Sequence, residues 1–201
     1  DGRGEAEHAR RIARDLHDSI SQQLAAAAWK AGRFAEEIAP VEIKTRKGVE
    51  VFAADDHMRP DSTLEGLAKL SAAFSKNGCV TAGNASGIVD GAAAILLASE
   101  RAVKTHGLKP LGRLTHWATV GVEPSLMGMG PAPATRRVLE KAGLSLNDID
   151  LIEVNEAFAA QYLSVEKELG LDRDKVNVNG GAIALGHPLG MTGTRLLLTL
   201  L

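Results

Sequence analysis

The glycine-rich run Val176–Arg195 places the tightest limits on how this 201-residue chain can fold. It begins as a short β-branched strand, passes through two glycines, and carries His187 between Gly186 and Pro188. A helix is expected over Thr192–Leu201. A histidine held on a tight turn beside a helix N-terminus can transfer protons. The same pattern also fits a glycine-rich turn that contains an incidental histidine.

Strand and helix patterns alternate from Gly78 onward, which predicts an α/β fold. The elements expected there are a helix over 88–105, a strand over 111–120, a helix over 134–142 ended by Gly143, a capping sequence over 145–148, a strand over 149–154, a helix ending at Gly170, and the run described above. Earlier in the chain we expect a long helix over 5–37, and then two strands, Val41–Thr45 and Val49–Ala53, with Gly48 in the turn. A short helical piece is expected around Leu64 to Ala68, extending towards Phe74.

Asn155 follows directly after the predicted strand over 149–154. In α/β folds, ligands and catalytic groups gather at the carboxyl ends of strands, which favours a functional role for this residue. The alternative is that Asn155 only caps the following helix. Glu156 stands directly beside it, and this favours the functional interpretation.

Composition excludes several classes of function. A net charge of -2 gives no reason to expect nucleic acid or an anionic membrane as a partner. No run of eighteen apolar residues is present, so we expect no membrane span and a cytoplasmic location. The single cysteine, Cys79, excludes an internal disulfide and fits a reducing compartment.

The segment over residues 9–24 is similar to the phosphoacceptor box of sensor histidine kinases. By that resemblance His17 would accept phosphate, with Asp18 assisting as a base. The alternative is a solvated charged helix with a surface histidine. The sequence shows no nucleotide-binding kinase domain after this segment, so phosphotransfer is not the favoured function.

From about residue 21 the chain resembles the thiolases, a family of acyl-CoA C-acyltransferases. The stretches that carry the resemblance are Val80–Gly87, Trp117–Val122, Met127–Pro131, Asn155–Ala159 and Gly186–Pro188. The resemblance implies an incomplete thiolase-like α/β fold, with part of the loop domain and most of the C-terminal βαβ half. It covers a helix, hairpin and loop region over 21–77 and a truncated α/β region over 78–201, and the helix that resembles the phosphoacceptor box, over 1–24, precedes them.

The resemblance also implies a chemistry, which is a two-step acyl transfer between coenzyme A thioesters through a cysteine thiolate. His187 would activate that thiol and stabilise the thioester oxyanion, and Asn155 would hold a water that completes the oxyanion site. Acyl-CoA and CoA would be substrates, with no cofactor and no metal, and the protein would form a homo-oligomer. The residues at positions that line the CoA channel in the family are Arg59, Leu70, Phe74, Ala82, Ser86, Ala157 and Phe158.

The chain departs from the family pattern in its cysteines. The resemblance places the nucleophilic cysteine upstream of the matched segments and the second cysteine beyond Leu201, so that Cys79 is neither. A histidine cannot replace the thiolate that carries the acyl group. We therefore expect this 201-residue polypeptide, a truncated or chimeric reading frame, to be inactive in thiolysis and Claisen condensation. The alternative of a different class is a CoA-binding module without catalysis.

Overall fold

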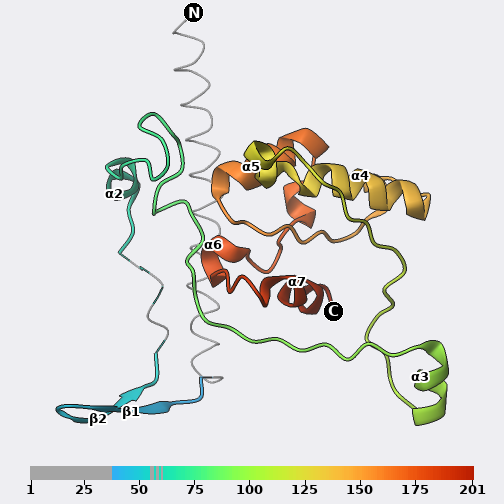
Figure 1. Ribbon diagram of the computed structural model, residues 1–201, viewed down its shortest axis with the longest axis horizontal. Helices are drawn as coiled ribbons and strands as arrows, with labels where there is room; N and C mark the ends of the chain where they lie inside the picture. Colours follow the sequence, from blue (N-terminus) through green and yellow to red (C-terminus); the bar gives the residue numbers. More distant parts are fainter. Residues whose placement is uncertain (1–37, 55–56, 58, 60) are drawn as a thin grey trace, which may run out of the picture. The chain divides into compact units, whose positions relative to one another are not determined.

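The computed structural model describes residues 38–54, 57, 59 and 61–201, which belong to two compact units (Figure 1). The first unit ends at Ser71 and the second comprises Ala72–Leu201. The helix expected over 5–37 and the candidate phosphoacceptor His17 lie outside the described residues. The division of the chain after residues 24 and 77 stays a prediction.

The first unit contains the predicted hairpin. Strands β1 (Val41–Thr45) and β2 (Gly48–Phe52) pair antiparallel, with Thr45 opposite Gly48. Gly48 has a φ of +131°, a conformation that disfavours side chains with a Cβ, and this confirms why a glycine stands at this turn. Helix α2 (Leu64–Ala68) follows, with the Thr63 hydroxyl accepting a hydrogen bond from the Gly66 N–H.

The core of the second unit lies between helix α5 (Ala159–Leu169) and the segments that precede and follow it. Its buried members are Val154, Tyr162, Val165 and Val176. Helix α4 (Pro131–Ala142) and the 3-10 helix η1 (Pro124–Met129) both pack against α5. The segments around residues 152 and 176 run parallel through one bridge, in which the Ile152 N–H donates to the Lys175 carbonyl. The strands predicted over 149–154 and from Val176 thus pair through a single bridge only.

Helix ends in this unit agree with the local sequence signals. Helices α4 and α5 end at Gly143 and Gly170, which have left-handed φ values of +68° and +67°. The 3-10 helix η2 (Leu146–Asp148) begins at a capping box in which the Asp148 carboxylate accepts from the Ser145 N–H. These predictions are confirmed.

Two longer expectations are wrong. The helix predicted over 88–105 is confined to α3 (Glu100–His106), and residues 88–99 form neither helix nor strand. The strand predicted over 111–120 pairs with no strand in the described part of the chain. The reason is lack of packing, because Leu96, Leu111 and Trp117 are 68–81% exposed, and an element gains most of its stability from burying its apolar face.

The C-terminal part of the second unit carries short elements around the glycine-rich turn. They are the 3-10 helix η3 (Arg173–Lys175), helix α6 (Ala182–Leu185) and helix α7 (Thr192–Leu200). The apolar side chains of Leu197, Leu198 and Leu201 on and after α7 are 42–56% exposed. Within the described residues, every helix is too short or too polar to cross a membrane.

Candidate functional site

The two residues singled out in the sequence, Asn155 and His187, lie in contact. The side-chain nitrogen of Asn155 is 3.3 Å from Nε2 of His187. On the other side of the imidazole ring, Nδ1 lies 2.8 Å from the hydroxyl of Thr192. That hydroxyl donates in turn to the carbonyl of Pro188, at 3.1 Å. The histidine is therefore held at both ring nitrogens, by groups from two different segments.

Backbone bonds fix the turn that carries His187. The Pro188 carbonyl accepts from the N–H groups of both Met191 and Thr192, which ties the turn to the first residues of α7. The His187 N–H donates to the carbonyl of Gly87, at 2.8 Å. Gly186 has a φ of +90°, and a Cβ at that position would overlap the side chain of Val89. The conformation of the turn thus requires a glycine before the histidine.

Asn177 fixes the chain just before Asn155. Its side-chain oxygen accepts from the Val154 N–H and its side-chain nitrogen donates to the Val154 carbonyl, both at 2.9 Å. The side-chain amide of Asn177 thereby makes the two hydrogen bonds that the backbone of a neighbouring strand would make, at the point where the backbone bridge ends. Asn177 itself has a φ of +48°, which is tolerated by asparagine more often than by other side chains.

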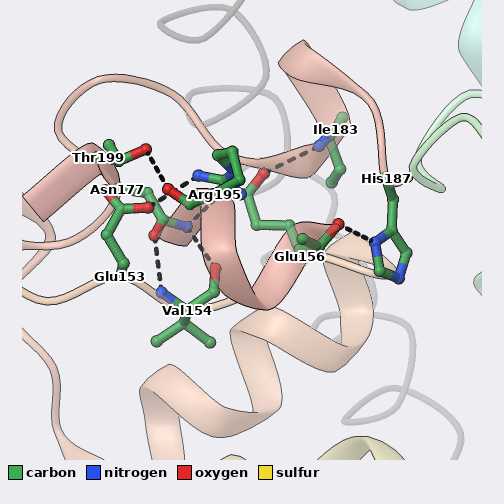
Figure 2. Close-up of polar contacts among 9 residues, drawn as sticks. Glu153, Val154, Glu156, Asn177, Ile183, His187, Arg195 and Thr199 are labelled. Carbon is green, nitrogen blue, oxygen red and sulfur yellow. Dashed lines mark hydrogen bonds and ion pairs between the residues drawn. The ribbon is translucent and has the colours of Figure 1, made fainter. Parts of the chain in front are cut away.

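Glu156 joins the same segment to helix α6, as Figure 2 shows. This side chain is 1% exposed, and one carboxylate oxygen accepts from Asn177 at 3.0 Å. The other oxygen accepts from the Ile183 N–H, at 3.2 Å, in the first turn of α6. A Cβ on Gly181 would overlap this carboxylate, which explains the second glycine of the pair at 180–181. The carboxylate therefore acts as a clamp between the segment of Asn155 and the segment that leads to His187.

A second buried contact ties helix α7 to the same segment. Arg195 donates to the carboxylate of Glu153 at 3.1 Å, and the Glu153 side chain is only 2% exposed (Figure 2). Thr199 bonds back to the Arg195 carbonyl one turn earlier. Glu153 thus contacts α7 through an ion pair, and Glu156 contacts α6 through a hydrogen bond.

The other candidate residues of the second unit gather around residues 84–87 and 157–158. The Ser86 hydroxyl and the Ser86 N–H both bond the Ala157 carbonyl, and Ala85 forms a bridge with Phe158. The rings of Phe74 and Phe158 meet edge to face, with centroids 5.6 Å apart. Ala82 is exposed in the loop that precedes this pairing.

Arg59 and Leu70 belong to the first unit, and both are exposed. The structure therefore brings together Phe74, Ser86, Ala157 and Phe158, and separately Asn155 and His187, through contacts within the second unit. The alternative that Asn155 caps a helix is wrong, because the N-cap of α5 is Phe158.

Sequence reasoning missed Thr192 and Asn177. Both are polar and buried, with 3% and 7% of their surface exposed. Thr192 contacts His187, and Asn177 bonds Val154, the residue before Asn155. A threonine at the start of a predicted helix is an ordinary capping signal, which concealed its contact with His187. Asn177 lies between two valines of a predicted strand, where an asparagine is unusual, and that irregularity was the available signal.

Among the described residues, no group of three or more histidine, cysteine, aspartate or glutamate side chains is placed to hold a metal ion. Cys79, the single cysteine of the sequence, is exposed.

Comparison with known proteins gives the same family over almost the whole chain. The N-terminal domain of thiolases matches residues 5–101, and the thiolase C-terminal domain matches residues 108–201. The chain is 56% identical to an acetyl-CoA acetyltransferase of Escherichia coli over 193 residues, which are 94% of this chain and 49% of that protein.

Solved thiolase structures are similar to this one. The human mitochondrial 3-ketoacyl-CoA thiolase in complex with CoA gives a TM-score of 0.74 at 49% identity, over 92% of this chain and 49% of that one. The dimeric peroxisomal thiolase of Saccharomyces cerevisiae gives 0.78 at 44% identity, over 94% and 48%. The chain thus spans about half the length of the curated relatives it matches.

These matches correct one expectation. The thiolase resemblance begins at residue 5 rather than at residue 21, and it includes the segment that was compared with a kinase phosphoacceptor box. The comparisons do not support a histidine kinase origin for residues 5–24. A separate phosphotransfer function through His17 is therefore not favoured.

Proposed function

We propose, because the chain belongs to the thiolase family, that its second unit supplies the histidine and asparagine of a site for acyl transfer between coenzyme A thioesters. The observation that carries the proposal is the contact between Asn155 and Nε2 of His187, two residues 32 positions apart that a buried polar network holds together. Of the functions considered, a thiolase part is favoured over a CoA-binding module without catalysis.

In this proposal His187 is the base. Its Nε2 accepts the proton from a cysteine thiol, and the resulting thiolate attacks the thioester carbonyl, forming the new carbon–sulfur bond. The carbon–sulfur bond to coenzyme A then breaks, and the departing CoA sulfur takes up the proton. The imidazolium is meanwhile a donor to the oxyanion that develops on the carbonyl oxygen.

Asn155 would complete the oxyanion site. Its side-chain oxygen is buried and makes no hydrogen bond to any described residue. A buried polar atom of this kind is costly unless a partner is present during function. This supports the proposal that a water bound to Asn155 assists His187 in binding the oxyanion.

The thiols are the part of the chemistry that this sequence does not supply. Cys79 is exposed, and by the family resemblance it occupies neither of the two catalytic cysteine positions. The proposal therefore requires two thiols in addition to Cys79. The 201 residues by themselves are expected to leave acetyl-CoA unchanged.

Of the seven candidate residues named from the sequence, those in the second unit would contact coenzyme A, and Arg59 and Leu70 of the first unit remain candidates by the family resemblance alone. Within the second unit, the contacts of Ser86 with Ala157 and of Phe74 with Phe158 support a shared lining. Phe74 is 76% exposed, which leaves an aromatic surface available to an adenine or pantetheine group. We further propose that the protein is a homo-oligomer located in the cytoplasm, where a free cysteine such as Cys79 stays reduced.

Binding can be tested on the 201-residue chain by NMR titration with CoA. We expect the amide signals of Ser86, Ala157 and Phe158 to shift, while those of Ser145 and Asp148, in the exposed capping box, stay in place. A Phe74→Ala variant should weaken the binding. Absence of any shift at millimolar CoA would contradict the proposed substrate class.

A further inference from the structure

We propose that the hydroxyl of Thr192 is a positioning group that holds His187 in the tautomer with the proton on Nδ1, and so leaves Nε2 as the proton acceptor. The inference deepens the proposed function, because it rests on His187 being the base of the acyl-transfer site. It assigns a role to a buried residue outside the stretch Gly186–Pro188 that carries the family resemblance.

The first step of the argument concerns the single proton of the Thr192 hydroxyl. Its oxygen lies 3.1 Å from the Pro188 carbonyl, a group that can only accept. When the hydroxyl proton is donated there, the Thr192 oxygen presents a lone pair to Nδ1 of His187, 2.8 Å away. A contact of this length then requires the hydrogen to be on Nδ1.

The second step comes from the opposite edge of the ring. The side-chain nitrogen of Asn155 can only donate, and it lies 3.3 Å from Nε2. The nitrogen facing it must therefore carry a lone pair rather than a hydrogen. Two partners on different segments thus select the same tautomer. In it Asn155 donates to Nε2, Nδ1 donates to the Thr192 hydroxyl, and that hydroxyl donates to the Pro188 carbonyl.

The third step is that the position of Thr192 is fixed by contacts other than the one with His187. Its side chain is 3% exposed, and its N–H donates to the same Pro188 carbonyl at 3.0 Å. A β-branched side chain has few rotamers available, so little entropy is lost in aiming the hydroxyl at the ring. Neutral imidazole can carry its hydrogen on either nitrogen, so the choice is made by these neighbours.

The tautomer matters because only the nitrogen with a lone pair can take a proton from a thiol. The thiol would take the place of the Asn155 N–H at Nε2, whose 3.3 Å contact is long for a hydrogen bond. With the hydrogen on Nδ1, the bond to Thr192 is kept both before and after Nε2 is protonated. With the hydrogen on Nε2, the ring would present a donor to the thiol and could not act as a base there.

The test is nitrogen-15 NMR of the 201-residue chain labelled at histidine, at a pH where the imidazoles are neutral. We expect His187 to show a protonated Nδ1 and an unprotonated Nε2. In Thr192→Val, which keeps the shape of the side chain and removes the hydroxyl, the population should shift towards hydrogen on Nε2. Thr192→Ser should restore the wild-type pattern. The exposed His106 and His116 are internal controls that should keep the same tautomer populations in all three proteins.

A wild-type spectrum with the hydrogen on Nε2 would overturn the proposal. So would a Thr192→Val spectrum identical to wild type, with the methyl signals of the buried Val165 unchanged as evidence of an intact fold. Should Thr192→Val not fold, the wild-type and Thr192→Ser spectra decide the question alone. No substrate is used, so the outcome is independent of whether the chain takes part in acyl transfer.

Discussion

Among single residues, Glu156 is expected to have the largest effect on stability. Replacing it by alanine removes the acceptor for the Asn177 amide and for the Ile183 N–H. A buried donor left without a partner costs about 1–3 kcal/mol. We predict that Glu156→Ala lowers the free energy of unfolding, measured with urea, by at least this amount. Glu156→Gln, which keeps one acceptor oxygen, should lose less.

A matched control is Glu168→Ala, because Glu168 forms an ion pair with Arg136 in which both side chains are about half exposed. Exposed pairs of this kind contribute about 0–1 kcal/mol. Equal unfolding free energies for the two alanine variants would contradict the role of the buried carboxylate as a clamp.

Gly181 is predicted to be coupled to Glu156. A methyl group at position 181 would overlap the Glu156 carboxylate, so Gly181→Ala should destabilise the protein by roughly 1–3 kcal/mol. In the Glu156→Ala background the same substitution should cost much less, because the obstructing group is gone. A double-mutant cycle in urea measures this coupling, and strictly additive effects would show that the two positions do not interact.

Tyr162, the single tyrosine of the sequence, gives a prediction for alkaline pH. Burial, together with the nearby Glu166 carboxylate, raises the pKa of Tyr162 above its ordinary value of 10.0. Since the neutral phenol is the form favoured by folding, the stabilisation is complete below the unfolded pKa. It is lost as the pH rises through the folded pKa. Phenolate absorbance should therefore appear at higher pH in the native protein than in urea, and coincident titrations would contradict the burial of this ring.

At the scale of elements, the capping box before η2 gives a prediction for acidic pH. Hydrogen bonds from the Ser145 hydroxyl and N–H lower the pKa of Asp148 below its ordinary value of 3.8. The stabilisation is therefore present above that ordinary value and is lost as the pH falls through the folded pKa. Ser145→Ala should raise the pKa of Asp148 in a carbon-13 NMR titration. An unchanged titration of Asp148 would mean that the hydroxyl makes no contribution.

Turns and helix ends that depend only on their own residues could be predicted from the sequence. Gly48 in the hairpin turn, Gly143 and Gly170 at helix ends, and Ser145 before η2 were all predicted from local backbone requirements. These features need no distant partner, and the structure has them where the sequence placed them.

Elements that depend on distant partners were not predictable in this way. The segments over 88–99 and 111–120 have apolar patterns, but no described residue packs over Ile88 and Leu111 closely enough to bury them, and both are at least 80% exposed. At the site, Asn155 and His187 were predictable because each stands at a strand-to-helix transition. Thr192 was not, because its contact with His187 depends on the shape of the turn around Pro188.

At the scale of the whole molecule, exposed apolar surface predicts self-association. Leu197, Leu198 and Leu201 leave an apolar surface at the end of α7, and burial of such surface contributes about 25 cal/mol per Å². We expect sedimentation velocity to show species larger than a monomer, and Leu197→Lys to reduce them. Ile43→Lys, on the hairpin, is a matched control for added charge. A monomer at all concentrations would contradict the prediction.

Activity in a complete thiolase shows whether His187 is the base of the acyl-transfer site. In a chimera, this chain replaces the matching 193 residues of the Escherichia coli acetyl-CoA acetyltransferase, which supplies the remaining half. Thiolysis of acetoacetyl-CoA should be detectable, and His187→Ala should lower kcat/KM by roughly 10²–10⁴-fold, as expected for loss of a general base. His106→Ala should have no effect. A chimera whose activity is unchanged by His187→Ala would contradict the assignment of His187 as the base.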